Sequence, residues 1–310
     1  MDKILVSVAA GTPYDVVSTG FYSSYEEGGN GLLAPLDEYL TEWVYKDDFP
    51  PAVWQAVSWQ GHIYAVPQNH DIRGVAYNGI LFAEAGLDPD RPPQSWDELV
   101  SYTRRLTRVS EGLVTVRGFA RSSSVGGYAQ ELFWFMHQAG VPEMDAAQLT
   151  SNLNKPEALQ ALNALTAIGE AARFRETAVG TSFSQGQVAM QRHHPGLFFR
   201  AIRENPDIEQ AYGLFAPRKE PHTDPVAHAF VNGLGILAAS NNKDLAWQFI
   251  SAMYDDDILY GFEKASEFFS GKLTIAEQLM LEQPKMRLFY EIFPYFKASV
   301  IPPPRNTAQQ

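Results

Sequence analysis

The chain has 310 residues, which suffices for about two domains with a sizeable core. Its 24 basic and 36 acidic residues give a formal charge of −12, and this excess of acid argues against nucleic acid or an anionic membrane surface as a partner. The absence of cysteine excludes disulfides, thiolate metal sites and cysteine nucleophiles.

The first residues are predicted to form short, separate elements. Residues 3–10 read as the end of a helix that Gly11 closes, because glycine is a common residue just past a helix C-terminus. A short buried strand is expected at 15–17, followed by a loop over 19–30 that carries three aromatic residues. A surface helix is expected to start within 36–40.

The stretch 59–78 has the most informative pattern. Alternating residues at 62–65 predict a half-buried strand, and Pro67 is expected to end its pairing because proline has no N–H for the ladder. A short apolar strand is expected at 74–77. A polar segment between two apolar strands predicts a bridge between two lobes, with side chains facing a cleft, where small-molecule sites are common. The polar residues of this bridge are Gln68, Asn69, His70, Asp71 and Arg73.

Helices and strands alternate over the rest of the chain. The S-x-x-E sequence from Ser95 to Glu98 is a capping box that opens a helix. Further helices are expected over 128–138, from a cap at Asn154, and after 241–242. A turn over 183–190 leads into a strand that ends at 193–196, and a buried strand is expected at 233–239. A last helix begins near 284, and the alternation as a whole predicts an α/β fold. The apolar face of the last helix is expected to hold Phe289, Ile292, Phe293 and Phe296.

No segment carries a decisive catalytic or metal motif. The G-x-G-x-x-A pattern at 233–238 is not followed directly by a helix, so a buried strand is a better interpretation than a dinucleotide site. His193 and His194 are adjacent and would point to opposite faces of a strand, so they cannot easily chelate one ion. Three pairs of acidic residues, at 26–27, 37–38 and 97–98, leave a glycosidase open as an alternative. No metal site and no cofactor are predicted.

Asp71 and Tyr290 are candidate ligand residues from their local context. Asp71 lies in the polar bridge, where it either pairs with Arg73 or accepts hydrogen bonds from two sugar hydroxyls. Tyr290 lies off the apolar stripe of the last helix. Its ring could cover the C–H face of a sugar while its hydroxyl forms a hydrogen bond.

Motifs spread over most of the chain resemble the extracellular solute-binding proteins that serve bacterial ABC importers. Their order matches the family's large carbohydrate-binding branch, to which maltose-binding protein belongs. The resemblance rests on these residues: Gly61-x-x-Tyr64-Ala-Val-Pro67, Tyr77-Asn78, Leu81-Phe82-x-x-Ala85-Gly86-Leu87-Asp88-Pro89, Ser95-Trp96-Asp97-Glu98-Leu99, Asn154-x-Pro-Glu-Ala158, Phe183-x-x-Gly186-x-x-Ala189-Met190, Gly213-Leu214-x-x-Pro217 and Ser240-Asn-Asn-Lys243.

This resemblance implies a two-lobe periplasmic-binding-protein fold with a hinge and an interlobe ligand cleft. Lobe 1 would comprise 1–71 and 235–272, and lobe 2 would comprise 72–234 and 273–310. The family's first strand is expected before residue 1, and its last helices after 302–304, so the chain is expected to be shortened at both ends.

The resemblance also nominates ligand-binding residues. The family places an acidic, hydroxyl-binding residue in its first hinge strand, at the position of Asp71, and a cleft aromatic residue at the position of Tyr290. The loop 122–128 is a weaker nominee. Arg73, Arg192 and Arg200 would suit an acidic sugar if they face the cleft. The full set of expected ligand contacts is Thr19, Phe21, Tyr22, Asn69, Asp71, Arg73, Tyr128, Gly196, Phe198 and Tyr290.

The function that the resemblance implies is capture of a sugar or oligosaccharide and its delivery to ABC permease subunits, without catalysis, cofactor or nucleic acid. The protein would act as a monomer in the periplasm or outside the cell, with lipoprotein tethering left open. The printed chain has no signal-peptide pattern, however, and taken literally would stay in the cytoplasm. A carbohydrate-active enzyme and a truncated fragment that binds nothing remain the alternatives.

Overall fold

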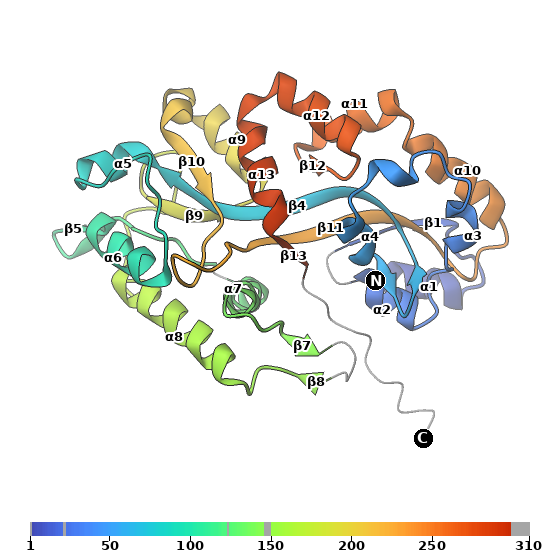
Figure 1. Ribbon diagram of the computed structural model, residues 1–310, viewed down its shortest axis with the longest axis horizontal. Coiled ribbons are helices and arrows are strands. Elements are labelled where there is room, and N and C mark those ends of the chain that lie inside the picture. The colour runs from blue at the N-terminus through green and yellow to red at the C-terminus, as the bar shows by residue number, and fades with distance from the viewer. Residues whose placement is uncertain (1, 21–22, 123, 146–149, 299–310) are drawn as a thin grey trace. The chain divides into compact units, whose positions relative to one another are not determined.

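The computed structural model describes residues 2–20, 23–122, 124–145 and 150–298, and the chain divides into two compact units (Figure 1). Unit 1 holds Met1–Asp71, Phe230–Pro284 and the stretch from Ala298, and unit 2 holds Ile72–Ala229 and Lys285–Lys297. The chain therefore changes unit inside two long strands, β4 (Val66–Asn78) and β11 (Ala227–Ile236). The bounds of the two lobes given above, and their closure on a ligand, remain predictions.

Unit 1 consists of short helices and antiparallel strands. β1 pairs antiparallel with the end of β11, with Val17 opposite Gly235, and β12 pairs antiparallel with β4, with Ser270 opposite Asn69. Besides its parts of β4 and β11, the unit contains α1 (Asp2–Ala9), β1 (Val16–Thr19), α2 (Ser23–Gly29), α3 (Asp37–Leu40), the 3-10 helix η1 (Lys46–Asp48), α4 (Pro51–Gln55), β2 (Ser58–Trp59), β3 (His62–Ile63), α10 (Lys243–Met253), α11 (Asp256–Ser266), β12 (Phe269–Ser270) and α12 (Leu273–Glu282).

Aromatic rings fill the core of unit 1. Trp43 contacts the rings of Phe49 and Tyr254 at centroid distances of 5.8 and 5.4 Å. Tyr254 is fully buried, and its hydroxyl donates to the Val66 carbonyl oxygen at 2.7 Å. The ring cluster thus joins the α10–α11 corner to the start of β4.

The glycines of the predicted strand at 233–239 have a packing role. A Cβ atom on Gly233 would lie 2.5 Å from the Val66 carbonyl oxygen, and one on Gly235 would lie 3.0 Å from that of Tyr64. A side chain would collide with backbone at Gly233 and would be tightly crowded at Gly235, so close packing accounts for the G-x-G pattern without a dinucleotide. A buried strand is confirmed here, but its bounds differ from the predicted 233–239: β11 begins at Ala227 and ends at Ile236.

Unit 2 has β4 between two antiparallel partners. Val75 lies opposite Arg192 of β9 and opposite Phe215 of β10. Helices α6, α7 and α8 pack together through buried residues that include Leu99, Trp134 and Leu165 (Figure 1). Besides its parts of β4 and β11, the unit contains α5 (Gly79–Glu84), α6 (Trp96–Leu106), β5 (Arg108–Ser110), β6 (Leu113–Val116), α7 (Val125–Gln138), β7 (Met144–Asp145), β8 (Thr150–Ser151), α8 (Pro156–Ala171), β9 (Met190–His193), α9 (Pro195–Glu204), η2 (Pro206–Ala211), β10 (Tyr212–Phe215), α13 (Arg287–Ile292) and η4 (Phe293–Tyr295). Two short elements fall at its boundaries with unit 1, η3 (Pro284–Met286) and β13 (Phe296–Ala298).

The prediction that Pro67 ends strand pairing is wrong. β4 runs without interruption from Val66 to Asn78, and the polar residues Gln68 to Asp71 are buried within it. Proline holds φ near a value that extended backbone tolerates. It lacks an N–H donor, so a strand can continue through it only where that donor is not needed for pairing with a neighbouring strand.

Several element boundaries also differ from the predictions. The expected loop over 19–30 contains α2, and α7 begins at Val125 because Ser124 caps it. The cap of α8 is Lys155 rather than Asn154. In the helix expected after 241–242, Ala246 and Ile250 are buried, but the apolar Phe249 is 54% exposed. Pro294 lies where the last helix gives way to a 3-10 turn, so Phe296 does not continue its face.

Within the part of the chain that the structure describes, no helix is both long enough and apolar enough to cross a membrane.

Candidate ligand-binding site

A polar pocket of about 240 Å³ lies within unit 2 and is lined in part by strands β4 and β9. β4, β9, the segment 120–122, α7 and the first turn of α9 all contribute to its wall. The lining residues are Arg73, Ala120, Arg121, Ser122, Glu131, Gln191, Arg192, His194 and Leu197.

Backbone pairing holds these residues together although they are far apart in sequence. Gly74 and Val75 of β4 pair with His193 and Arg192 of β9, which places the end of β9 next to Arg73. The segment 117–120 runs parallel to the chain before and within β9, and the Ala120 N–H donates to the Met190 carbonyl oxygen at 2.8 Å. Strand register therefore fixes one side of the pocket.

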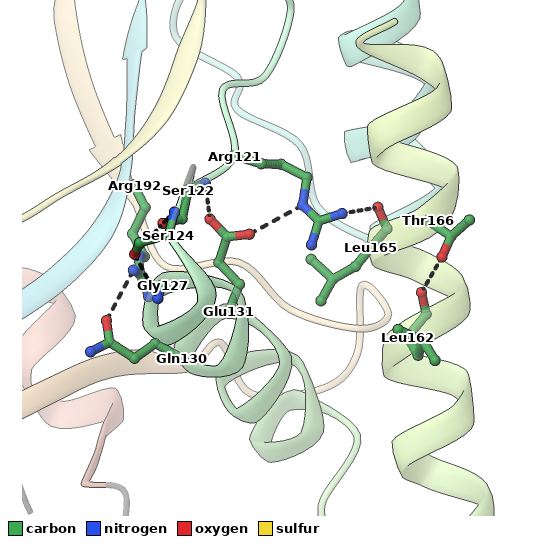
Figure 2. Close-up of polar contacts among 10 residues, drawn as sticks. All are labelled: Arg121, Ser122, Ser124, Gly127, Gln130, Glu131, Leu162, Leu165, Thr166 and Arg192. Carbon is green, nitrogen blue, oxygen red and sulfur yellow. Dashed lines mark hydrogen bonds and ion pairs between the residues drawn. The ribbon is translucent and has the colours of Figure 1, made fainter. Parts of the chain in front are cut away.

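One amide oxygen joins two of the pocket's arginines. Gln130 Oε1 on α7 accepts a hydrogen bond from Arg73 Nη1 at 2.9 Å. The same oxygen accepts a second hydrogen bond from Arg192 Nη2 at 3.1 Å (Figure 2). A carbonyl oxygen has two lone pairs, so both are engaged. The amide oxygen of Gln130 thus holds two guanidinium groups at one acceptor atom.

The third arginine has a carboxylate partner of its own. Arg121 Nε donates to Glu131 Oε2 at 3.1 Å, and the other Glu131 oxygen accepts the Ser122 N–H at 2.8 Å (Figure 2). The Arg121 guanidinium also donates to the Leu165 carbonyl oxygen and lies 5.2 Å from the centre of the Tyr128 ring. These contacts tie α7 to α8 and fix the pocket wall.

Two further pockets adjoin this one through shared residues. A pocket of about 460 Å³ shares Arg121 and is lined by the rings of Tyr128 and Phe174. Another, of about 370 Å³, shares Gln191 and Leu197 and contains His193, Arg200 and Glu204. Burial lowers the pKa of His193 to about 3, so this imidazole is neutral at physiological pH.

Unit 1 holds a separate group of buried polar side chains on β4 and its neighbours. Asn69 Oδ1 accepts a hydrogen bond from Asn232 Nδ2 at 2.9 Å, and Asp71 is 3% exposed. Burial raises the pKa of the Glu263 carboxyl well above its usual range and lowers the pKa of His70 to about 3. Both groups are therefore held in their neutral forms.

The residues that were predicted from sequence to contact a ligand lie in different parts of the structure. Arg73 lines the pocket with Arg192, whereas Arg200 lines the neighbouring one. Tyr128 lines the third pocket, and Gly196 lies in the first turn of α9 beside the lining residue Leu197.

The other nominated residues lie elsewhere. Thr19 is buried at the end of β1, and Tyr290 is 36% exposed on α13. Phe198 is fully buried against Tyr212 and Phe289, in the core of unit 2. Phe21 and Tyr22 lie outside the described residues. Whether any of these residues contacts a ligand stays a prediction.

Sequence reasoning missed Gln130, Glu131 and Arg121. Gln130 and Glu131 lie on α7, whose sequence is mostly apolar. The sequence of this helix therefore gives no reason to select these two polar side chains as pocket residues. Arg121 sits in a Ser- and Gly-rich segment that gives no periodicity. Among the described residues, no group of three or more His, Asp or Glu side chains is arranged to hold a metal ion.

The two-unit α/β fold and the polar pocket are features of a protein that holds a small solute. Over residues 1–258 the chain matches the family described as "Bacterial extracellular solute-binding protein", and it belongs to that family.

Curated relatives of this chain are also solute-binding proteins. The chain is 30% identical over 103 residues to the mannitol-binding protein of Pseudomonas aeruginosa, covering 33% of this chain and 23% of that protein. It is 26% identical over 203 residues to the sn-glycerol-3-phosphate-binding periplasmic protein UgpB of Escherichia coli, covering 62% and 44%. The chain thus spans less than half the length of these curated relatives.

The fold is that of a solute-binding protein from Thermotoga lettingae whose crystal structure contains alpha-D-tagatose. The TM-score is 0.80 at 23% identity, covering 96% of this chain and 78% of that one.

Proposed function

We propose that this chain is the solute-binding component of an ABC importer and that its solute is a sugar or a closely related polyol. The observation that carries the proposal is the match to extracellular solute-binding proteins over residues 1–258. The names of its relatives add support, because mannitol and tagatose are both polyhydroxylated molecules.

The chemistry of the unit 2 pocket supports a polyhydroxylated solute. Guanidinium, amide, hydroxyl and carboxylate groups line it, and together they offer both donors and acceptors to a ligand. Specificity for hydroxyl groups depends on such convergent polar contacts, because a buried polar group without a partner is costly.

We propose that the protein binds its solute without chemical change, with no cofactor. A glycosidase needs two carboxylates that flank one bond. Among the pocket-lining residues that the structure describes, Glu131 is the single carboxylate, and its two oxygens already accept from Ser122 and Arg121. This arrangement favours binding over hydrolysis.

The finer parts of the proposal follow from the family. The protein would act as a monomer outside the cytoplasmic membrane, where it would hand its solute to permease subunits. Asp71, Asn69 and Arg73 of β4 are proposed to take part in binding because they are polar residues of a long, buried strand.

A thermal-shift screen of the purified chain against monosaccharides, polyols and oligosaccharides tests this function. A ligand present at 100 times its Kd adds about 2.7 kcal/mol of stability, which raises Tm visibly. We expect at least one sugar to stabilise the parent but not Asp71→Asn. The matched control is Asp97→Asn, which makes the same change at an exposed position of α6 and should respond as the parent does.

Product analysis completes the test. Recovery of unmodified ligand would support a binding protein, whereas a hydrolysed ligand would establish the enzyme alternative. A cooperative melt that no sugar or polyol shifts would contradict the proposal.

A further inference from the structure

A second polar cavity of unit 2 contains His193 and is called the His193 pocket below. It has a volume of about 370 Å³ and is lined by residues of the segment 181–187, β9 and α9. This volume lies within the range of roughly 300–1,000 Å³ that is typical of small-molecule sites. Its described lining residues include one cation and one anion, Arg200 and Glu204, which pair with each other at 3.6 Å. The wall is therefore polar without a net charge.

His193 has an uncommitted ring nitrogen. The residue is 3% exposed, and its Nε2 lies 3.2 Å from Gln191 Oε1. Burial lowers the pKa of His193 to about 3, so the ring is neutral and carries one proton. An amide oxygen can only accept a hydrogen bond, so this proton is on Nε2 and Nδ1 is an acceptor. Nδ1 is buried and has no hydrogen-bond partner among the residues that the structure describes.

The surroundings of His193 hold its ring in place. His193 lies opposite Gly74 in the pairing of β9 with β4, and its ring contacts the Phe183 ring edge-on, with 4.7 Å between the centroids. A buried acceptor that lacks a partner costs free energy. A molecule that donates a hydrogen bond to Nδ1 would remove this cost.

Two serines in the same wall also present acceptor oxygens. Ser184 Oγ donates to Glu204 Oε2 at 2.6 Å. The single hydroxyl proton of Ser184 is thereby used, so Ser182 is the donor in the 3.0 Å contact between the two hydroxyl oxygens. Ser182 Oγ in turn accepts the Gln185 N–H at 3.3 Å. Both serine protons are thus directed toward the carboxylate, and each serine oxygen keeps a lone pair for a further donor.

The segment 181–187 is fixed by contacts of its own. The Ser182 N–H donates to Gln187 Oε1 at 3.0 Å, and an added Cβ atom on Gly180 would lie 2.0 Å from that oxygen. Asn205 Nδ2, at the end of α9, donates to the Ser184 carbonyl oxygen at 3.0 Å. These contacts position the acceptors before a ligand arrives, which lowers the entropy lost on binding.

We propose that the His193 pocket is a second binding site, for a neutral molecule rich in hydroxyl groups such as a polyol or a neutral monosaccharide. One ligand hydroxyl donates to His193 Nδ1, and others donate to the oxygens of Ser182 and Ser184. A carboxylate or phosphate ion brings acceptors where the wall already has acceptors, and the guanidinium of Arg200 is paired with Glu204. The site is additional to the solute site of the proposed function and does not depend on it.

Nuclear magnetic resonance of protein with ¹⁵N-labelled histidine tests the site at the atom concerned. The ring signals of His193 are identified by their loss in His193→Phe, and mannitol and glucose are the probes. We expect at least one probe to shift the Nδ1 signal in a saturable manner, because a lone pair that accepts a hydrogen bond changes the shielding of its nitrogen. A Nδ1 signal that neither probe shifts at tens of millimolar would overturn the proposal.

Ser184→Ala tests whether the response comes from this wall. It removes an acceptor oxygen and the donor to Glu204, so we expect the affinity read from the His193 signal to fall at least fivefold. Ser101→Ala is the matched control, because this exposed residue of α6 does not line the pocket, and it should stay within about twofold of the parent. Equal affinities of the two variants would contradict the site, provided that a cooperative thermal melt shows both to be folded.

Charged relatives of glucose test the class of ligand. Because Arg200 and Glu204 compensate each other, neither glucuronate nor glucosamine should bind more tightly than glucose. At least tenfold tighter binding of either charged sugar, read from the same His193 signal, would overturn the assignment to neutral molecules.

Asp71→Asn separates this inference from the proposed function. A His193 response that persists in this variant, while the rise in Tm with solute is lost, would establish two sites. Loss of both responses together would mean a single site and overturn the inference. A His193 ring that responds in neither protein would also overturn it, and the Asp71-dependent rise in Tm would still decide solute capture.

Discussion

At the scale of single residues, two glycines have opposite surroundings. Gly118 packs against the backbone of α6, where an added Cβ atom would lie 2.1 Å from the Thr103 carbonyl oxygen. Gly261 lies exposed in the middle of α11, and a Cβ atom there would have no heavy atom within 4 Å. Both are glycines in sequence, but only the first is required by packing.

We therefore expect alanine to have opposite effects at these two positions. Gly118→Ala should lower the free energy of unfolding by about 1–3 kcal/mol, because the backbone must move to admit the methyl group. Gly261→Ala should raise it by roughly 0.5–1 kcal/mol, because alanine is the better helix former. Urea unfolding of both variants measures the change in the free energy of unfolding. A change in the same direction for both variants would contradict the packing argument.

At the scale of elements, two serines cap helices in the same way, although only one is recognisable in sequence. Ser95 Oγ accepts the Glu98 N–H at 3.1 Å, and Ser124 Oγ accepts the Gly127 N–H at 3.0 Å. Ser95 is followed by the glutamate of a capping box, whereas Ser124 is followed by Val125 and two glycines. The second cap was missed because glycines weaken the helical pattern that should follow it.

Removal of the Ser95 hydroxyl should destabilise α6. Ser95→Ala should cost about 1 kcal/mol, within the usual range for an N-cap, because the Glu98 N–H then loses its acceptor. Ser95→Asp, which keeps an acceptor at the cap, should recover most of this loss. Chemical denaturation of the three proteins provides the values, and an unchanged stability for the alanine variant would mean that water replaces the cap fully.

At the scale of the whole molecule, buried histidines should make stability depend on pH. Burial lowers the pKa of His70 and of His193 to about 3, and the pKa of His228 well below its usual value. The unfolded chain takes up a proton on each histidine near pH 6.5, whereas the folded chain does not until far lower pH. The unfolded state therefore binds more protons in this window, and stability rises with pH.

The expected result is a loss of stability as the pH falls below about 6.5, with each histidine contributing up to about 1.4 kcal/mol per pH unit. Glu263 opposes this trend, because its raised pKa means that the folded state binds the extra proton above about pH 4.5. Urea unfolding between pH 5 and 7.5 tests whether the free energy of unfolding rises with pH. His70→Asn should have a shallower slope than the parent, while His222→Asn, an exposed control, should keep the parental slope.

Local sequence patterns determined much of the fold. The capping box at Ser95, the closing glycine at position 11 and the apolar strand at 233–239 were all readable, because a few adjacent residues encode each feature. The family could also be recognised from the order of the motifs, because the positions that shape a shared fold recur in the same order along the chain. The continuous β4 was not readable, because Pro67 and five polar residues locally favour a break.

Only the tertiary structure decided the composition of the pocket. Arg73 and Arg192 are more than a hundred positions apart in sequence, and the pairing of β4 with β9 brings them to the same amide oxygen. A shift of strand register by one residue would turn their side chains to the other face. Burial likewise depends on the packed fold, which is why Phe198 is a core residue and Arg200 lines a different pocket. The sequence alone determined the class of protein, whereas long-range packing determined which side chains meet.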